Sequence, residues 1–396
     1  MTNKPNIRLA PPSGAQKTEE APKRKIWERS GFDYPLFTIV IVMLAFGIVM
    51  MFSASYATAY TSTGDSLYYV KKQAVFAIIG IIAMLVLSAI DYHFFAKKPV
   101  ILLSVSASVL LMGLVKVMGT TQGGAERWLD VGGITFQPSE ILKFTLIILF
   151  AYLTEKRIAK LREFRHGFLP FAFALVVACG LLMIQPHLSA TIIVFTIGFT
   201  MMYVAGINAK HLFLALAATV IFVVLAVIAL KGMGYDYFDS RIQSWLYPES
   251  DIKDKTFQTY QSLVTIGSGG LFGLGFGNSR QKYAYLPASR NDFIFSIICE
   301  ELGLVGAVFV IGIFIIFVLR GFYIATHARD KFGMLAAFGI TLQIGLQALL
   351  NIAVVSNSIP NTGISLPFFS YGGSALLMQL GEIGILLSIS RKASLE

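Results

Sequence analysis

The sequence predicts an all-α polytopic integral membrane protein with ten transmembrane helices, and three observations carry that prediction. Of the 396 residues, 56% are hydrophobic and only 14% are charged, whereas a soluble domain averages about 25% charged residues. Ten apolar stretches each have roughly the 17 to 25 residues that a helix needs to cross a hydrocarbon core about 30 Å thick. Lysine and arginine gather in alternate connections between these stretches.

The chain divides into four parts. Residues 1–33 are polar and of mixed charge, which predicts a disordered cytoplasmic tail without the apolar core of a signal peptide. Residues 34–230 hold helices 1 to 7, residues 231–291 form one large extracytoplasmic loop between helices 7 and 8, and residues 292–396 hold helices 8 to 10 and a short cytoplasmic tail. The predicted spans are 34–54, 73–91, 99–118, 138–154, 168–184, 188–206, 211–230, 294–319, 333–355 and 367–389.

The basic residues decide the orientation of the spans, because cytoplasmic loops carry an excess of Lys and Arg. The connections rich in them hold Lys97, Lys98, Lys156, Arg157, Lys160, Arg162, Arg165, Lys210, Arg320, Arg329 and Lys331. An even number of spans then places both termini in the cytoplasm. The net charge of +10 follows from these loops and the tail and shows no nucleic-acid-binding motif, so no nucleic acid partner is expected.

Charged residues within spans are costly and mark a pathway or a site by default. Glu140 and Lys143 lie three residues apart in the fourth span, so their side chains can meet on one helix face. Two interpretations stay open for this pair: a buried lock between helices, or a contact with substrate. The adjacent Glu300 and Glu301 cannot share a helix face, and we favour a packing or gating role for them over catalysis.

Five glycines crowd the end of the large loop, at positions 269, 270, 273, 275 and 277. They do not predict a phosphate-cradling loop, because no βαβ unit surrounds them and their predicted side is extracytoplasmic. No nucleotide cofactor is therefore expected. We predict instead a backbone that turns sharply or approaches another segment closely. Histidine ligation of a metal is not expected, because only His187 falls near the outer face.

Several ordered motifs lie along the chain. The longest is PNTGISLPFFSYGGS at residues 360–374. The other motifs are RWLD at 127–130, QPSEILK at 137–143, QPHL at 185–188, LPASRNDFIF at 286–295 and EELG at 300–303. Together they resemble one known family, the SEDS proteins of shape, elongation, division and sporulation, and the longest is similar to the signature segment of that family. Within the family, the basic tail and residues 351–355 are more similar to the FtsW subfamily than to RodA.

The resemblance implies a ten-helix fold and an activity, the polymerisation of lipid II into glycan strands on the outer face of the membrane. It implies that Asp292 is the essential catalytic carboxylate. The residues that we predict to bind substrate are Arg127, Glu140, Lys143, Ser370 and Gly372. The chain departs from the family pattern at Ala288, where a carboxylate is common, and at Thr135, where some division members have arginine.

The implied chemistry fits one carboxylate. The leaving group is a lipid pyrophosphate, so a single base that deprotonates the incoming sugar hydroxyl suffices. Alternatively, a divalent cation such as Mg²⁺ or Mn²⁺ could bridge Asp292 and the pyrophosphate, with Asp292 as metal ligand. Cations expected near the developing charge are Arg127, Lys143, Lys71, Lys72, Lys116 and Arg241.

Two other functions remain open: a lipid II flippase, for which the charges within spans would form the pathway, and a scaffold that only recruits a transpeptidase. A positioned carboxylate on one face favours the polymerase. The family further implies a class B penicillin-binding protein as partner, with other divisome proteins, and a location in the cytoplasmic membrane at the division septum. A polymerase specific for sporulation or elongation is the alternative within the family.

Overall fold

Helices dominate the fold, as predicted. A computed structural model describes residues 32–122, 125–131, 134–232, 237–250, 256–283 and 286–393, and each predicted apolar span coincides with a helix among them. These helices are α1 (Tyr34–Thr63), α2 (Tyr68–Ala89), α3 (Lys98–Met118), α4 (Pro138–Lys156), α5 (Leu169–Ile184), α6 (Leu188–Ala205), α7 (Ala209–Gly232), α10 (Ile294–Thr326), α11 (Lys331–Val355) and α12 (Gly373–Lys392). The predicted tail at 1–33 lies almost entirely outside the described residues.

Eight helices of the described residues are long and apolar enough to cross a membrane. They are α1, α2, α3, α5 with the turn before it, α6, α10, α11 and α12. The 19-residue α4 carries Glu140 and Lys143 near its start, and the described apolar stretch of α7 covers 209–225. The structure therefore supports a multi-pass helical chain.

Four helix boundaries differ clearly from the predicted spans: α1 continues to Thr63, α2 begins at Tyr68, α10 continues to Thr326 and α12 begins at Gly373. The start of α1 at Tyr34 is as predicted, and Asp33 is its N-cap, because its carboxylate accepts a hydrogen bond of 2.8 Å from the Leu36 amide. Helix α12 begins at Gly373 and not at 367, because residues 367–372 form a turn. The turn begins at Pro367 and ends at Gly372, and its apolar residues Phe368 and Phe369 make it look like part of the span in the sequence.

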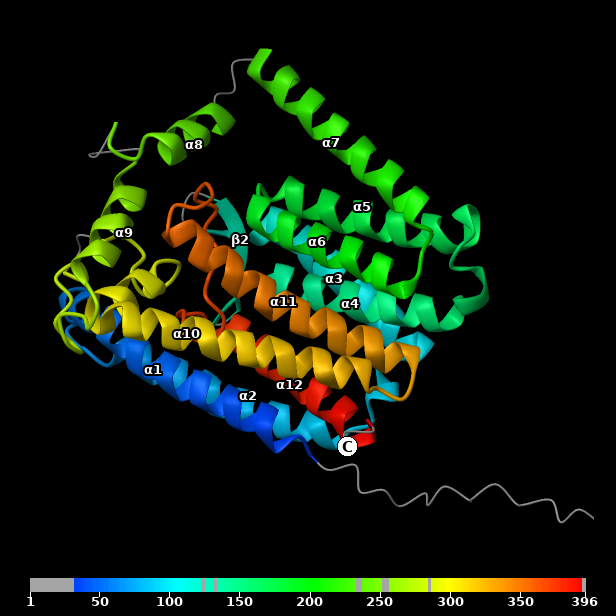
Figure 1. Cartoon of the computed structure of the whole chain (residues 1–396), viewed down its shortest axis with the longest axis horizontal. Helices are drawn as coiled ribbons and strands as arrows, with labels where there is room; N and C mark the ends of the chain where they lie inside the picture. The colour runs from blue at the N-terminus through cyan, green and yellow to red at the C-terminus, as the bar shows by residue number, and fades with distance from the viewer. Residues whose placement is uncertain are drawn as a thin grey trace, which may run out of the picture.

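The loops hold regular structure that the sequence did not predict. A three-stranded antiparallel sheet of β1 (Thr120–Gln122), β2 (Ala125–Val131) and β3 (Ile134–Phe136) precedes α4. The large loop contains α8 (Tyr237–Leu246) and α9 (Phe257–Ser268). Short helical turns follow α2 and α4: η1 (Tyr92–Phe94), η2 (Ile158–Lys160) and the π-helical η3 (Phe164–Phe168). Figure 1 shows β2, α8 and α9 gathered at one end of the long helices.

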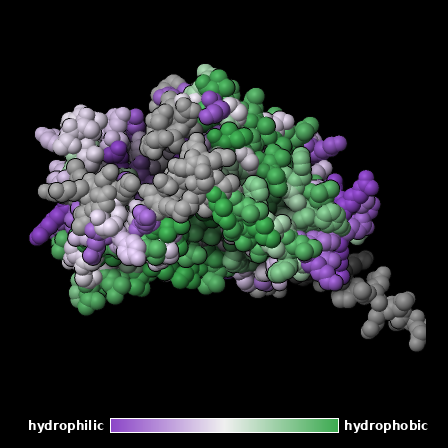
Figure 2. Space-filling model, turned by 90° about the horizontal axis from the view of Figure 1, so that it is seen from above, coloured by the Kyte–Doolittle hydropathy of each residue, from purple (hydrophilic) through white to green (hydrophobic). Residues whose placement is uncertain are grey.

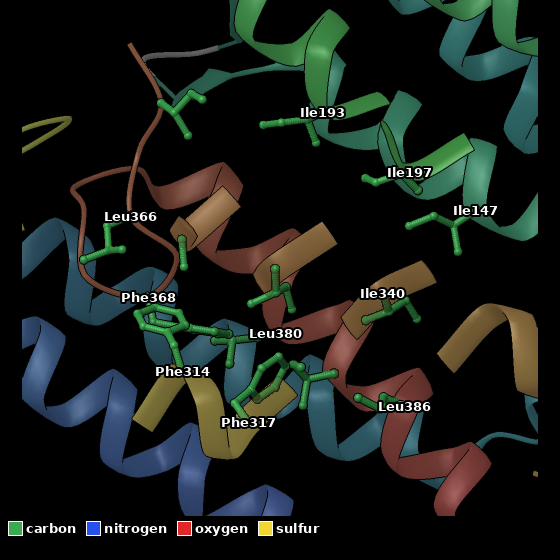
Figure 3. Packing of buried hydrophobic residues seen from close by; sticks show 14 of the residues in the cluster. Ile147, Ile193, Ile197, Phe314, Phe317, Ile340, Leu366, Phe368, Leu380 and Leu386 are labelled. Atoms are coloured by element: carbon green, nitrogen blue, oxygen red, sulfur yellow. The ribbon is translucent and has the colours of Figure 1, made fainter. Parts of the chain in front are cut away.

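The core lies between α4, α6, α10, α11 and α12 (Figure 3). Ile147, Ile193, Phe317, Ile340 and Leu386 come from these five helices in turn, and each is at most 3% exposed. Helix α12 packs along α2, and α10 packs between α1 and α11 (Figure 1). These contacts make α11 and α12 the central elements of the bundle.

Small residues permit the closest approaches, as in other membrane bundles. A Cβ at Gly384 of α12 would come within 2.6 Å of the Met84 carbonyl oxygen of α2. A Cβ at Gly47 of α1 would come within 2.4 Å of the Phe368 carbonyl oxygen in the turn before α12. The turn at 367–372 is therefore pressed against the bundle wall.

The surface is divided along the helix direction. In Figure 2 hydrophobic residues cover the middle of the visible face, and hydrophilic residues gather toward the two ends of the long axis. Large apolar side chains on the long helices are exposed, for example Leu103 at 70%, Phe173 at 69% and Phe222 at 72%. An exposed apolar belt with polar ends is the pattern of a protein solvated by lipid.

Helix α10 is interrupted near its start by a docked loop. Gly303 has φ 66° and ψ −160° inside the helix, and residues 270–275 bond to the exposed backbone on both sides of it. The four backbone bonds are Leu274 N–H to Glu300 O (2.9 Å), Gly275 N–H to Glu301 O (3.0 Å), Leu304 N–H to Gly270 O (2.9 Å) and Val305 N–H to Leu271 O (3.2 Å). The predicted close approach of the glycine-rich segment is thereby confirmed.

Candidate active site around Asp292

Asp292 lies at the end of the large loop, two residues before α10 begins. Its side chain is half-buried, and burial raises the pKa of its carboxyl to about 6, while the positive charge of Arg127 acts in the opposite direction. A Cβ built on Gly363 would lie 3.5 Å from its Oδ2 atom. The carboxylate therefore faces the signature segment, at a place where that segment has no side chain.

The loop around Asp292 is held by Asn351, a fully buried residue of α11. The Asn351 side-chain amide donates hydrogen bonds to the Asp292 carbonyl (2.7 Å) and to the Ile364 carbonyl (2.6 Å). Gln343 and Gln347 precede it at intervals of four residues and are 1% and 3% exposed. Residues four apart share a helix face, so α11 presents a polar row to the interior of an apolar bundle.

Ser370 and Gly372 lie in the turn before α12, and Ser370 supports the same loop from its other side. Ser370 is buried, and its hydroxyl donates to the Asn291 carbonyl (2.6 Å) and accepts from the Leu366 amide (2.8 Å). The Gly372 amide donates to Gln73 Oε1 of α2 (3.2 Å). The Ser370 hydroxyl thus holds the residue before Asp292, whereas the Gly372 amide ties the turn to α2.

Arg127 reaches the site from β2. Its guanidinium donates to the Pro186 carbonyl at the start of the turn into α6. The adjacent His187 is 7% exposed, and burial, followed by the positive charges of Arg127 and Lys143, lowers the pKa of its imidazole to about 3. A neutral histidine therefore stands among the two predicted cations and contributes no charge of its own.

Glu140 and Lys143 form the predicted pair within the first turns of α4. Lys143 Nζ lies 2.8 Å from Glu140 Oε2, and both side chains are buried. Lys143 also donates to Gln347 Oε1 (3.1 Å), and the Gln347 amide in turn donates to the Ser365 carbonyl (3.1 Å). Hydrogen bonds therefore link this pair to the signature segment through α11.

The polar row ends at α12. The Gln343 amide donates to both carboxylate oxygens of Glu382, at 3.0 and 2.8 Å. Glu382 is 2% exposed. This carboxylate, which lies within the tenth predicted span, thus joins the buried polar row of α11 through Gln343.

Glu300 and Glu301 anchor the docked loop and are both essentially fully buried. Glu300 accepts hydrogen bonds from Ser279 and from the Arg280 amide (3.1 Å). Glu301 accepts from Ser53 (2.6 Å) and pairs with Lys282 at 3.2 Å. Their contacts are those of packing residues, in agreement with the role that we favoured for them.

The other predicted cations lie outside this cluster or are bound elsewhere. Lys71 pairs with Asp65 at 2.7 Å, Lys72 contacts the Tyr68 hydroxyl at 2.7 Å, and Lys116 is exposed near the end of α3. The side chain of Arg241 lies outside the described residues. A further cation, Arg290, stacks on the Tyr69 ring at 4.0 Å, two residues before Asp292.

Comparisons with known proteins show the family of the chain. The family model of the FtsW, RodA and SpoVE cell cycle proteins matches residues 34–395. The chain belongs to this family. The resemblance to the SEDS proteins is therefore confirmed, over the whole helical part of the chain.

Relatives and solved structures match along nearly their full length. The chain is 38% identical to the probable peptidoglycan glycosyltransferase FtsW of Trichlorobacter lovleyi, covering 93% of the chain and 95% of the relative. It is 37% identical to stage V sporulation protein E of Bacillus subtilis, over 91% and 97%. The fold matches a chain of a peptidoglycan synthase complex with TM-score 0.75 and Thermus thermophilus RodA with TM-score 0.66, each at 26% identity over 92% of this chain and 99% of that chain.

Some residues of the site were missed by the sequence analysis. The row of Gln343, Gln347 and Asn351 has a detectable signal, polar residues at i, i+4 and i+8 in an apolar span. Gln73 of α2 has no such periodic signal, because it is one polar residue near a helix end. Its contact with Gly372 depends on the packing of α2 against α12.

Proposed function

We propose that this protein is a peptidoglycan glycosyltransferase that polymerises lipid II into glycan strands on the outer face of the cytoplasmic membrane. The observation that carries the proposal is Asp292, a carboxylate beside the cation Arg127 and held by α11 and the signature turn. The names of the FtsW relatives support the same activity. A carboxylate at the membrane boundary can act as the base, and a cation beside it can stabilise the lipid pyrophosphate that leaves when the sugar is transferred.

In the proposed reaction Asp292 acts as general base. Its carboxylate takes the proton of the 4-hydroxyl of the acceptor sugar as that oxygen forms a bond to C1 of the donor sugar. The bond from C1 to the pyrophosphate oxygen breaks, and its electron pair leaves with the lipid pyrophosphate. Because pyrophosphate is a good leaving group, this step needs no second carboxyl group to protonate it, unlike most glycoside hydrolysis.

The negative charge that develops on the pyrophosphate needs cations aimed at it. Arg127 supplies a guanidinium, which matches the planar, bidentate geometry of phosphate oxygens. Lys143 is the second cation near this place, because, in addition to burial, both Arg127 and Lys143 lower the pKa of His187. We assign Arg127 to the pyrophosphate and keep two roles for the Glu140–Lys143 pair, a substrate contact or a helix lock.

A divalent ion bound by Asp292 is the alternative to the general-base role. Among the described residues, no group of three or more His, Cys, Asp or Glu side chains could hold a metal ion. A Mg²⁺ or Mn²⁺ ion at this site would take Asp292 as its side-chain ligand and complete its shell with phosphate oxygens and water, as hard cations do. Asp292 would then orient the pyrophosphate and would not be the base.

We also propose that α4 and α7 cross the membrane with the eight candidate spans, giving ten spans and cytoplasmic termini. The interhelical contacts of α4 with α3, α6 and α11 support this placement for α4. The loops after α4 and α6 then face the cytoplasm, in accord with their lysines and arginines. Asp292, β2 and the turn before α12 lie together on the outer side.

The partner that we propose is a class B penicillin-binding protein, a transpeptidase, which would contact the large loop through its region near the membrane. A matching fold occurs in a solved complex described as coordinating polymerisation and crosslinking. The FtsW names among the relatives support septal synthesis together with other divisome proteins. The match to a sporulation protein at similar identity makes a sporulation-specific polymerase the alternative.

The deciding experiment compares wild type with Asp292→Ala, each purified with its transpeptidase, for conversion of labelled lipid II into glycan polymer on a gel. We expect polymer from wild type and none from Asp292→Ala. A matched control is Asp65→Ala, an exposed outer carboxylate that pairs with Lys71, which should retain activity. EDTA sensitivity would favour the metal-ligand role of Asp292 over the base role.

The flippase gives a different pattern in the same preparation. Polymer that is unaffected by Asp292→Ala, or absent from both proteins while lipid II still crosses vesicle membranes, would overturn the polymerase. Absence of both polymer and lipid transfer, with intact binding of the transpeptidase, would favour the scaffold.

A further inference from the structure

A cationic pocket of about 320 Å³ lies at the end of α4, lined by Lys156, Arg157, Ala159, Lys160 and His166. Helix α4 has 19 residues, so a rise of 1.5 Å per residue places this pocket ~28 Å from the Arg127 end of the helix. It is therefore separate from the site around Asp292. None of the proposed steps of polymerisation uses it.

The walls of the pocket are fixed by the fold. The half-buried Arg157 guanidinium donates a hydrogen bond of 2.8 Å to the His166 carbonyl, which holds the end of α4 to the π-helical turn η3. Gly167 permits the tight return of the chain, because a Cβ there would come within 2.2 Å of the Leu161 carbonyl oxygen. The cations consequently project from a closed turn and not from an extended strand of loop.

The charge of the segment is unbalanced. Residues 155–166 contain five lysines and arginines against two glutamates. Among the ion pairs of the described residues, the one in this segment joins Glu163 to His166 at 2.9 Å. The other acid, Glu155, is half-buried, and the lysines that line the pocket are exposed. An anion with more than one acceptor oxygen is the ligand that suits such a pocket.

Exposed apolar side chains adjoin the cations. Ile158 is 53% exposed, Phe164 55% and Leu169 47%. On α5, Phe173 and Val176 follow Leu169 at four and seven residues and are 69% and 70% exposed, so the three lie along one helix face. An apolar stripe that starts at a cationic pocket suits an acyl chain below a charged headgroup. Free phosphate would use only the cations.

We propose that this pocket binds the phosphodiester headgroup of an anionic phospholipid of the inner leaflet, with an acyl chain along the exposed face of α5. Clusters of basic residues at the cytoplasmic ends of spans attract anionic lipids, and pockets between helices can bind their headgroups specifically. The assignment depends on the membrane orientation and not on the polymerase activity. It gives the basic loop a ligand in addition to its part in setting topology.

The test is native mass spectrometry of the full chain in detergent, titrated with dioleoyl phosphatidylglycerol and, separately, dioleoyl phosphatidylcholine. We expect retained phosphatidylglycerol, and an affinity lower by on the order of tenfold or more in Lys156→Gln/Lys160→Gln, because each basic residue near an anionic surface contributes about 1 kcal/mol. The matched control is Lys97→Gln/Lys98→Gln, which removes the same charge from exposed positions at the start of α3. Its affinity should stay close to that of wild type, because neither lysine lines the pocket.

The remaining outcomes separate the possible sources of binding. Equal losses in both double variants, or equal retention of phosphatidylcholine by wild type, would overturn the pocket as the site. Displacement of phosphatidylglycerol by millimolar inorganic phosphate would assign the pocket to free phosphate and overturn the lipid. If the glutamine variant does not fold, Lys156→Arg/Lys160→Arg must retain the lipid, and the variant Arg157→Lys, which keeps the charge, must retain it too.

Discussion

The side chain of Asn351 bonds to the backbone carbonyl of Asp292 at 2.7 Å and to that of Ile364 at 2.6 Å. One buried amide of α11 therefore joins the end of the large loop to the signature segment that faces it. Ser370 closes the arrangement from the other side through the Asn291 carbonyl. The proposed base is consequently placed by residues that do not themselves carry charge.

The first prediction concerns this positioning. Asn351→Asp keeps the size of the side chain but removes the donor, so the Asp292 carbonyl loses its partner. We expect kcat for lipid II polymerisation to fall on the order of 10- to 100-fold, because small displacements of a reacting group have effects of this size. The control Ser356→Ala removes an exposed hydroxyl at the end of the same helix, which bonds only to near neighbours. Unchanged activity in Asn351→Asp would contradict the positioning role.

The second prediction concerns pH. The pKa of Asp292 is raised to about 6, so below that pH the carboxyl is protonated and cannot accept the proton of the acceptor hydroxyl. Polymerisation should rise as the pH increases through about 6 and then level off. Arg127 lowers this pKa, so its replacement by Gln should move the acid limb of the kcat/KM profile to higher pH.

The position of the limb distinguishes this effect from a loss of substrate binding. Arg127→Lys keeps the positive charge and should leave the limb near its original pH, even where the rate is reduced. A limb that stays in place in Arg127→Gln would show that Asp292 does not limit the reaction at acid pH.

The third prediction separates the two roles left open for Glu140 and Lys143. Lys143→Met leaves a buried carboxylate without its cation, which typically costs about 3–5 kcal/mol of stability. The double variant Glu140→Gln/Lys143→Met removes both charges, and its thermal unfolding should lie much nearer to wild type. As a control, Lys71→Met breaks the exposed pair with Asp65 and should cost about 0–1 kcal/mol.

Activity of the double variant then decides between the roles. A stable but inactive double variant assigns Lys143 to the substrate. A stable and active one assigns the pair to the packing of α4, because the charges would then be dispensable once their burial is balanced.

Much of the fold could be predicted because a membrane requires long apolar helices. The bounds of α3, α4 and α6 lie within two residues of the predicted spans, since charged or turn-forming residues flank each one. The start of α12 was misplaced because Pro367, Phe368 and Phe369 are apolar yet form a turn. Hydropathy predicts that such residues prefer an apolar environment, but it does not predict whether their backbone is helical.

The site could be predicted in part because several of its residues lie in sequence motifs. Asp292, Arg127 and Ser370 lie in motifs that carry the family resemblance, and the fold brings all three to one end of the bundle. The contact of Gln73 with Gly372 and the bond from Lys143 to Gln347 depend on which helices are neighbours. Neither composition nor periodicity determines that, so these contacts appear only in three dimensions.

The last prediction concerns the interruption of α10, on which the docked loop depends. Gly303 has φ 66° and ψ −160°, a conformation essentially restricted to glycine that costs other residues about 1–3 kcal/mol. A Cβ there would also come within 2.4 Å of the Gly273 amide nitrogen. Gly303→Ala should therefore lower the melting temperature and loosen residues 270–275.

The same helix offers a matched control. A Cβ at Gly312 meets nothing within 4 Å, so Gly312→Ala should leave the melting temperature unchanged or raise it slightly, since alanine favours the helix. Loosening should appear as faster amide hydrogen exchange at Leu274 and Gly275, whose N–H groups bond to Glu300 and Glu301. Because this loop leads to Asp292, polymerisation should fall in Gly303→Ala and persist in Gly312→Ala. Equal rates of amide hydrogen exchange in the two variants would contradict the prediction that docking of the loop onto α10 requires glycine at position 303.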